Sequence, residues 1–265
     1  MGSEMCIRDR AGPLRGAPAV DAVVHCAGAV SDTARRAALV AANVAGTRHV
    51  LASFPRARFV HVSTASVYDP RRPTVNARED AAPVARYPDA YGASKAAAER
   101  VVRVVRPDAV ILRPHAVYGP GDPSLLPRVL GAVRGATLYA VGPGDQRISL
   151  TAVGNLARAC LLAVETDASG VFNVADAEPV RLADALAAVL AERGIDARVR
   201  FVPLTVAWPL ALAAETAHRL GAGPPRVTRY AAVHLARERT LDLTAARTVL
   251  GYRPEPTSFA GAGAW

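Results

Sequence analysis

Hydrophobic and polar positions alternate along the chain in a way that predicts strands and helices in turn. Apolar runs at residues 20–28, 57–63 and 108–114 predict buried strands, because a strand covered on both faces is apolar throughout. The segments Thr33 to Phe54 and Tyr91 to Val105 show the wider spacing of apolar residues that is typical of amphipathic helices. Alternating strands and helices of this kind predict a parallel, doubly wound α/β sheet.

Beyond Tyr118 the pattern is less regular, and glycine and proline punctuate the chain at 119–123 and 142–145. We therefore predict a sheet domain over residues 11–118 and a smaller α/β lobe over 119–265, some segments of which return to the first sheet. Within this lobe, helices are predicted at 153–165, 182–193, 206–220 and 244–250, and short strands at 171–174 and 199–202.

The composition is that of a folded chain without a membrane-spanning segment. Of 265 residues, 51% are hydrophobic and 21% are charged, which excludes a disordered protein. The longest uninterrupted apolar stretch, Val206 to Ala214, is half of the roughly 18 residues that suggest a membrane span. Residues 1–10 differ in character from the alanine- and arginine-rich remainder, so we interpret them as a non-native addition.

Neither the cysteines nor the net charge indicates a binding function. Cys6, Cys26 and Cys160 show no CxxC spacing and no histidine at ligand spacing, so neither a disulfide framework nor a metal site is predicted. The formal net charge is +9, but the arginines are scattered and no basic stripe is interleaved with aromatic residues. A nucleic-acid partner is therefore not expected.

The only lysine of the chain lies four residues after a tyrosine. Lys95 follows Tyr91 in the sequence YGASK, so both side chains project from one face of the predicted helix. A nearby ammonium favours the phenolate form of tyrosine by charge attraction, and it can hydrogen-bond a ribose hydroxyl. We therefore predict that Tyr91 and Lys95 form a catalytic pair rather than an exposed helical pair.

Hydroxyl side chains directly follow the second predicted strand. The strand FVHVS runs into Thr64 and Ser66, just past its carboxyl end, where open α/β sheets bind ligands. Serine and threonine also commonly cap loops by bonding the backbone, so these residues alone leave both interpretations open.

Together these motifs resemble the extended short-chain dehydrogenase/reductase family, the NAD-dependent epimerase/dehydratase group. The resemblance runs from about Val20 to Phe259 and follows the order of the family's motifs. These motifs are VVHCAG (23–28), NVAGT (43–47), VSTASVY (62–68), YGASK (91–95), LRPHAVYGPGD (112–122), VGNLARA (153–159), FNVADAEPV (172–180) and LDLTAARTVLGYRP (241–254).

The resemblance implies a Rossmann-like doubly wound parallel sheet with a smaller C-terminal substrate lobe. It further implies NAD or NADP as cofactor and a small-molecule substrate. Because a nucleotide cofactor is available in the cytoplasm, we expect a cytoplasmic location. Relatives often dimerise through two helices that form a four-helix bundle, so the resemblance also implies a homodimer through 33–54 and 91–105.

The resemblance also implies residue roles. Tyr91 would be the general acid/base on the substrate oxygen, and Lys95 would lower the pKa of Tyr91 and hold the nicotinamide ribose. Thr64 would hydrogen-bond the same substrate oxygen, with Ser66 the less favoured candidate. For Asn43, a capping or packing role remains equally open. The implied cofactor-binding residues are Cys26, Ala27, Gly28, Asn43, Ser63, Tyr91, Lys95, Pro114 and His115.

One motif of the family is missing. No strand followed by a GxxGxxG turn precedes residue 20, and Gly12 and Gly16 have the wrong spacing to cradle a pyrophosphate. We therefore predict an N-terminally truncated member that lacks roughly 50 residues of a βαβαβ segment and binds cofactor poorly. The strand at 21–26 would then be an exposed edge, and the choice between NAD and NADP remains open.

The substrate motifs favour an apolar alcohol. Nucleotide-sugar members usually carry an asparagine where this chain has Ala116, and the C-terminal motifs are more similar to the 3β-hydroxysteroid dehydrogenase branch. The apolar stretch Val202 to Leu212 suits either a substrate pocket or a core helix. We predict an NAD(P)-dependent oxidoreductase that acts on a secondary alcohol or ketone. A nucleotide-sugar epimerase/dehydratase and a non-catalytic binding protein are the alternatives.

Overall fold

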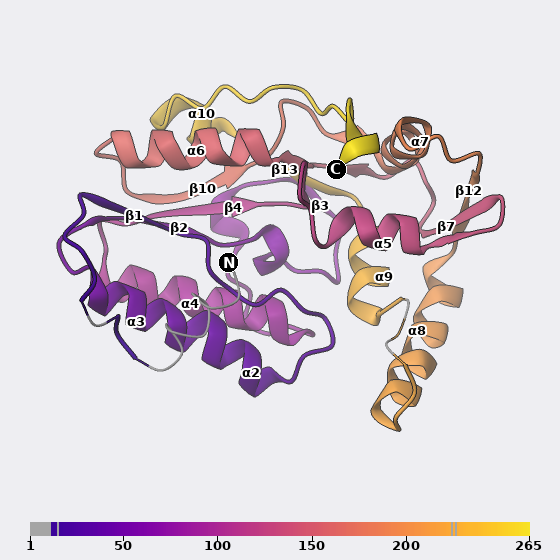
Figure 1. The fold of residues 1–265 in the computed structure, drawn as a ribbon, viewed down its shortest axis with the longest axis horizontal. Helices are drawn as coiled ribbons and strands as arrows, with labels where there is room; N and C mark the ends of the chain where they lie inside the picture. Colours follow the sequence, from indigo (N-terminus) through magenta and orange to yellow (C-terminus); the bar gives the residue numbers. More distant parts are fainter. Residues whose placement is uncertain (1–11, 15, 224, 226) are drawn as a thin grey trace.

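The central sheet has four parallel strands. The computed structural model describes residues 12–14, 16–223, 225 and 227–265 (Figure 1), so the interpretation of residues 1–10 lies outside the described residues. The strand order is β1-β2-β4-β10, which confirms the predicted α/β fold. These strands are β1 (Ala22–His25), β2 (Arg58–Val62), β4 (Val110–Pro114) and β10 (Gly170–Val174).

β1 lies at an edge of this sheet, as expected for the strand at 21–26. Within the described residues it pairs only with β2, and Val24 is 40% exposed. The loss of a preceding βαβαβ segment stays a prediction.

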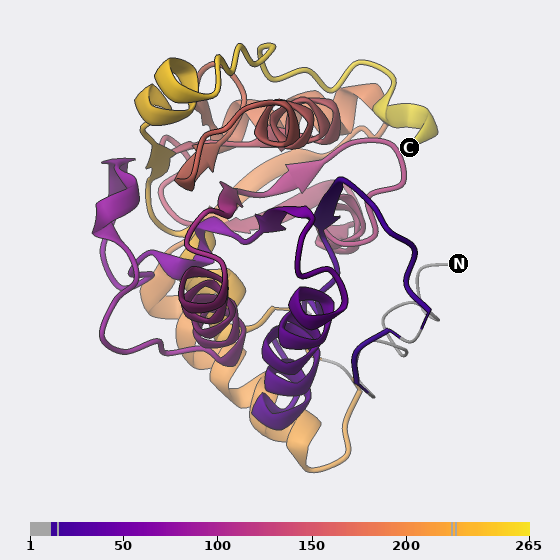
Figure 2. The same cartoon turned by 90° about the vertical axis from the view of Figure 1, so that its left-hand side faces the viewer.

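Helices cover both faces of the sheet. On one face, α4 lies beside the helical stretch that contains α2 and α3 (Figure 2), while α6 and α10 cover the other face (Figure 1). The helix predicted from Thr33 begins instead at Arg36, and a π-helical segment interrupts it. The bounds are α2 (Arg36–Val40), η1 (Ala41–Ala45), α3 (Gly46–Ser53), α4 (Ala90–Val105), α6 (Val153–Glu165) and α10 (Thr244–Val249).

The remaining elements form three smaller sheets and their helices. The strand orders are β11-β8-β13-β3, β12-β7-β6 and β5-β9. The strands are β3 (Thr74–Ala77), β5 (Val117–Tyr118), β6 (Val133–Arg134), β7 (Thr137–Val141), β8 (Arg147–Ile148), β9 (Thr151–Ala152), β11 (Val180–Arg181), β12 (Arg198–Val202) and β13 (Arg239–Leu241). The helices are α5 (Leu125–Gly131), α7 (Leu182–Glu192), α8 (Leu204–Arg219) and α9 (Arg229–Leu235), with 3-10 turns η2 (Ala65–Val67), η3 (Glu79–Ala81) and η4 (Ala262–Ala264). The division of the chain at residue 118 stays a prediction.

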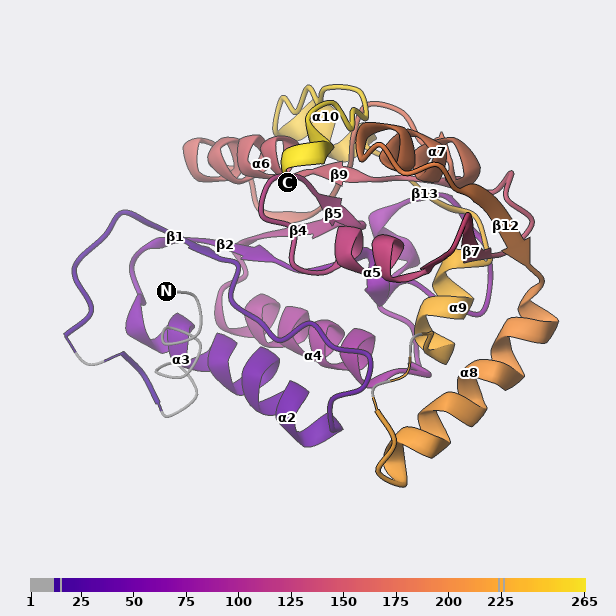
Figure 3. The same cartoon turned by 45° about the vertical axis from the view of Figure 1, so that its right-hand side comes forward.

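α8 projects from the body of the molecule and packs beside α9 (Figure 3). It begins at Leu204, two residues before the predicted start, and contains Pro209. Trp208 and Leu210 on this helix are 41% and 62% exposed, so α8 is not the fully buried core helix that its sequence allowed.

Throughout the described ranges, no helix is both long and apolar enough to cross a membrane.

A buried ion pair joins α4 to the central sheet. The Arg113 side chain on β4 is fully buried, and its Nε and Nη2 donate to the two carboxylate oxygens of Glu99 at 2.9 and 2.8 Å. Ser63 donates its hydroxyl to Glu99 at 2.6 Å, and Arg113 also donates to the Tyr68 hydroxyl at 3.2 Å. Because α4 carries the YGASK motif, this network fixes that helix relative to the ends of β2 and β4.

Candidate active site

The first turn of α4 sets the position of Tyr91. Asp89 caps the helix, and its Oδ1 accepts from the backbone N–H of Gly92 at 2.6 Å. A Cβ atom at Gly92 would lie only 2.7 Å from the carbonyl oxygen of Ser66. Only glycine therefore lets α4 approach the loop after β2 so closely, and Tyr91 is brought against that loop.

The hydroxyls of Thr64 and Ser66, which follow β2, cap a turn and lie beside the tyrosines of the site. Thr64 Oγ1 accepts from the backbone N–H of Ser66 at 3.2 Å and donates to Ser66 Oγ at 3.2 Å. Ser66 Oγ lies 2.8 Å from the hydroxyl of Tyr230 on α9. The ring of Tyr230 meets that of Tyr91 edge to face at 6.3 Å. The loop is thus lined by a chain of hydroxyls beside Tyr91.

Burial dominates the environment of the Tyr91 hydroxyl. Burial raises the pKa of Tyr91, and only a hydrogen bond with the Thr64 hydroxyl opposes that rise. Desolvation of the phenol outweighs the favourable hydrogen bond, and the lowering of the Tyr91 pKa by Lys95 stays a prediction.

Lys95 lies at the carboxyl end of β2. Its side chain is buried, and Nζ donates to the carbonyl oxygen of Val62 at 2.7 Å. Burial lowers the pKa of Lys95 to about 8, although the charge of Glu99 favours the ammonium form. Lys95 is therefore charged at neutral pH and has N–H groups beyond the one that Val62 accepts.

The segment after β1 passes close to Lys95. A Cβ atom at Gly28 would lie 3.1 Å from Asn43 Oδ1 and 3.8 Å from Lys95 Nζ. Asn43, on the π-helical segment η1, accepts from the N–H of Ala29 at 2.7 Å and donates to Ser94 Oγ at 2.9 Å. Asn43 thus fastens this segment to α4, which is the packing role that the sequence left open.

The other predicted cofactor residues lie on the same edge of the sheet. Cys26 and Ala27 follow β1, and Ser63 follows β2 with its hydroxyl committed to Glu99. Pro114 ends β4, and His115 Nδ1 lies 2.5 Å from the carbonyl oxygen of Ser149. Burial lowers the pKa of His115 to about 4, so its imidazole is neutral at pH 7. The fold brings all the candidates to the carboxyl ends of β1, β2 and β4.

Cys26 carries an unusually acidic thiol. Its pKa is lowered to about 7, mainly by a hydrogen bond with the buried Cys160 on α6 and further by the charge of Lys95, while burial opposes the shift. A cysteine thiolate is the reactive form toward alkylating reagents.

We expect the rate of Cys26 alkylation by iodoacetamide to rise with pH and to reach half its maximum near pH 7. Mass spectrometry of peptides separates this site from the other cysteines. Cys160→Ala removes the hydrogen-bond donor and should move the midpoint upward, whereas Leu161→Ala, at an exposed position on the same helix, should leave it unchanged. A midpoint near the ordinary value of 9.0 in the unmodified protein would contradict the assignment.

Two aromatic residues of α9 were missed by the sequence analysis. Tyr230 contacts Ser66 and Tyr91, and the ring of His234 lies 4.2 Å from that of Tyr230. Burial lowers the pKa of His234 to about 3, so it is neutral at pH 7. No spacing rule connects them to Tyr91, because α9 reaches the site only through the fold of the C-terminal part of the chain.

Comparison with known proteins identifies the family. The profile of the NAD dependent epimerase/dehydratase family matches residues 7–175. The chain belongs to this family. It is 34% identical over 247 residues to a 4-hydroxy-2-methyl-3-oxo-4-farnesyl-3,4-dihydroquinoline-1-oxide ketoreductase of Stigmatella aurantiaca, covering 89% of this chain and 74% of that protein. It is 28% identical over 271 residues to a 2-alkyl-3-oxoalkanoate reductase of Stenotrophomonas maltophilia, covering 91% and 78%.

Solved structures show the same fold. A UDP-glucuronic acid 4-epimerase from Bacillus cereus in complex with NAD superposes with a TM-score of 0.68 at 22% identity, covering 92% of this chain and 72% of that one. Members of the epimerase/dehydratase family depend on NAD or NADP, so the predicted family, fold and cofactor class are confirmed.

The residues of the site fit the nicotinamide end of such a cofactor. Gly28 leaves room beside Asn43 and Lys95 that a side chain would fill, and Lys95 presents a buried ammonium to that room. Ahead of β1, the described residues 12–14 and 16–21 provide no glycine-rich turn that could cradle the pyrophosphate. The fit therefore covers one half of a dinucleotide.

Proposed function

We propose that the protein is an NAD(P)-dependent oxidoreductase that interconverts an apolar secondary alcohol and its ketone. The observation that carries the proposal is the arrangement of Tyr91, Thr64 and Lys95 at the carboxyl ends of the central strands. Tyr91 is buried, hydrogen-bonded with Thr64, and carried on the same helix as the buried ammonium of Lys95.

Each of these residues has a defined task in the proposed reaction. The Tyr91 hydroxyl gives its proton to the carbonyl oxygen in reduction and takes it back in oxidation. Because burial raises the pKa of Tyr91, the phenol is protonated at neutral pH, as ketone reduction requires. Thr64 orients the Tyr91 hydroxyl, and Lys95 binds the ribose. A bound nicotinamide would supply or accept the hydride.

The environment of Ala116 supports an apolar substrate. Ala116 has a φ of +46°, in the left-handed region that favours glycine or asparagine. The chain nonetheless has alanine there, and so lacks an amide that could hydrogen-bond a sugar. The names of the two relatives, a ketoreductase and a 3-oxoalkanoate reductase, support the same substrate class.

The proposal is tested by following the absorbance of reduced nicotinamide with a panel of apolar ketones and of nucleotide sugars. We expect oxidation of NADH or NADPH with at least one apolar ketone and none with the nucleotide sugars. Turnover confined to nucleotide sugars would favour the epimerase/dehydratase alternative. Ligand binding without turnover in either set would favour the non-catalytic alternative.

Two further features of the protein stay predictions. A homodimer through the stretch from Arg36 to Ser53 and α4 would bury apolar side chains that the single chain exposes, such as Val40 and Val104 at 40% and 80%. A cytoplasmic location would give the enzyme access to its nucleotide cofactor.

A further inference from the structure

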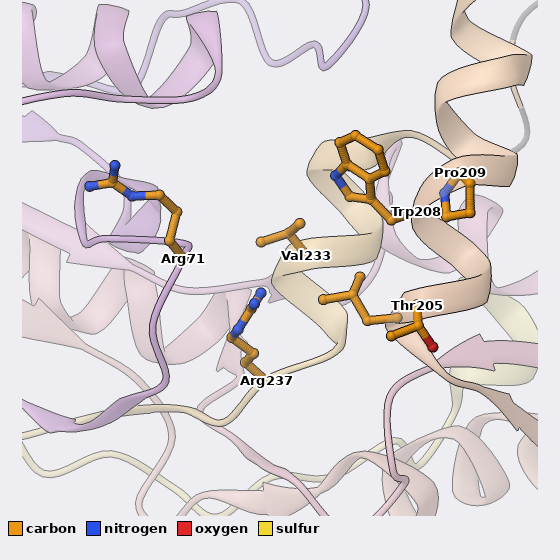
Figure 4. Close-up of a pocket in the computed structure, with 7 residues that line it drawn as sticks. Arg71, Thr205, Trp208, Pro209, Val233 and Arg237 are labelled. Atoms are coloured by element: carbon orange, nitrogen blue, oxygen red, sulfur yellow. The ribbon is translucent and has the colours of Figure 1, made fainter.

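A cavity of about 480 Å³ lies between α8, α9 and the loop after η2. Its volume is within the range of roughly 300–1,000 Å³ that is typical of small-molecule sites. Trp208 and Pro209 of α8 form one side, and Arg71 and Arg237 lie on the opposite side (Figure 4). Val233 of α9 lies between them, and Leu204 and Thr205 complete the lining.

The lining combines an apolar wall with two guanidinium groups and includes no carboxylate. The wall is held firmly at Trp208, because Arg229 stacks over its ring at 5.9 Å and is itself paired with Glu215 at 2.9 Å. Trp208 is nevertheless 41% exposed. A large aromatic face is thus fixed in place and open to a ligand.

The two arginines differ in their charge balance. Arg71 forms a two-pronged ion pair with Asp69, at 2.9 and 3.0 Å. Arg237 has no carboxylate within ion-pair distance in the described part of the chain, and its one hydrogen bond, to the carbonyl oxygen of Pro70, is long at 3.5 Å. Its guanidinium points toward the space between Arg71 and Val233 (Figure 4). The pocket therefore presents one uncompensated positive charge beside an apolar wall.

We propose that this pocket binds a small apolar carboxylic acid. Its alkyl chain lies against Trp208, Pro209 and Val233, and its carboxylate pairs with Arg237. The planar guanidinium of Arg237 binds a carboxylate through two parallel hydrogen bonds, and no carboxylate of the described residues competes for it.

The pocket adjoins the proposed catalytic site through α9. Tyr230 of that helix contacts Ser66 and Tyr91, whereas Val233, one turn further along, and Arg237, two residues beyond the end of the helix, line the pocket. The chain likewise continues from Ser66 in η2 through the following loop to Arg71. A bound acid therefore lies beside the reaction centre, but its binding does not depend on the proposed reaction.

Trp208 provides a direct readout of binding. The chain has two tryptophans, so Trp265→Phe leaves Trp208 as the only indole reporter. We expect octanoate to change the Trp208 fluorescence saturably, and octanol, which has the same chain but no charge, to bind at least tenfold more weakly. Calorimetry with the same two ligands on the unaltered protein gives a second measurement that needs no variant.

Arg237→Gln should weaken octanoate binding by about tenfold or more and leave octanol binding unchanged. Arg219→Gln, at an exposed position of α8 outside the pocket, is the matched control and should bind octanoate normally. Equal binding of octanol and octanoate, no saturable binding of octanoate, or unchanged binding in Arg237→Gln would each overturn the proposal. None of these readouts involves turnover, so failure of the proposed activity is distinguished from failure of this site.

Discussion

Replacing Tyr91 by phenylalanine is expected to lower the turnover of the active substrate by about 10²–10⁴-fold, which is the usual contribution of a positioned general acid. The change removes only the hydroxyl that would protonate the carbonyl oxygen. The ring remains, and with it the edge-to-face contact with Tyr230 at 6.3 Å. The fold and ligand binding should therefore be preserved, and the loss should appear in kcat.

Steady-state kinetics of the reductase reaction, with circular dichroism as a check on folding, measure this effect. Tyr139→Phe is the matched control, because Tyr139 lies on β7 with 47% of its surface exposed and makes no contact with the site. Its turnover should equal that of the unaltered protein. Retention of more than about a tenth of the activity in Tyr91→Phe would remove Tyr91 from the proposed role and leave another proton donor to be found.

Much of the central sheet and its helices could be predicted because their signal is local. Each buried strand is a short apolar run, and α4 and α6 carry a regular apolar spacing, so their bounds were predicted to within one residue. The π-helical segment at Ala41–Ala45 could not be predicted this way, because one extra residue in a turn leaves the helical pattern on both sides intact. The short strands β5, β6, β8, β9 and β11 have two residues each, too few to show any period.

Within the candidate site, too, local features could be predicted from the sequence and long-range contacts could not. Tyr91 and Lys95 are four residues apart on one helix, so their proximity follows from helix geometry alone. Tyr230 reaches Ser66 only through a long-range contact, and the raised pKa of Tyr91 depends on burial that no motif encodes. The ion pair between Glu99 and Arg113 also depends on the tertiary fold, because nothing in the sequence spacing of the two residues predicts that they meet.

Glu99→Gln is expected to lower the free energy of unfolding by about 3–5 kcal/mol, the usual cost of breaking a buried ion pair from one side. The change removes the negative charge that Arg113 faces through two hydrogen bonds, while the Arg113 side chain remains fully buried. A buried charge without a partner carries its full desolvation penalty, and the Ser63 hydroxyl loses a charged acceptor at 2.6 Å. Urea unfolding should show a lower midpoint with an unchanged slope.

Glu165→Gln, at the exposed end of α6, is the matched control and should change the stability by no more than about 0.5 kcal/mol. The double variant Glu99→Leu with Arg113→Met removes both charges and should be more stable than either single variant, because neither side is then left unpaired. Additive effects of the two changes, or a loss below about 1 kcal/mol in Glu99→Gln, would show that the pair does not hold α4 on the sheet. If the two changes are coupled as expected, Glu99 and Arg113 hold α4 on the sheet. They then fix the position of Tyr91 and Lys95 without contacting the substrate or the cofactor themselves.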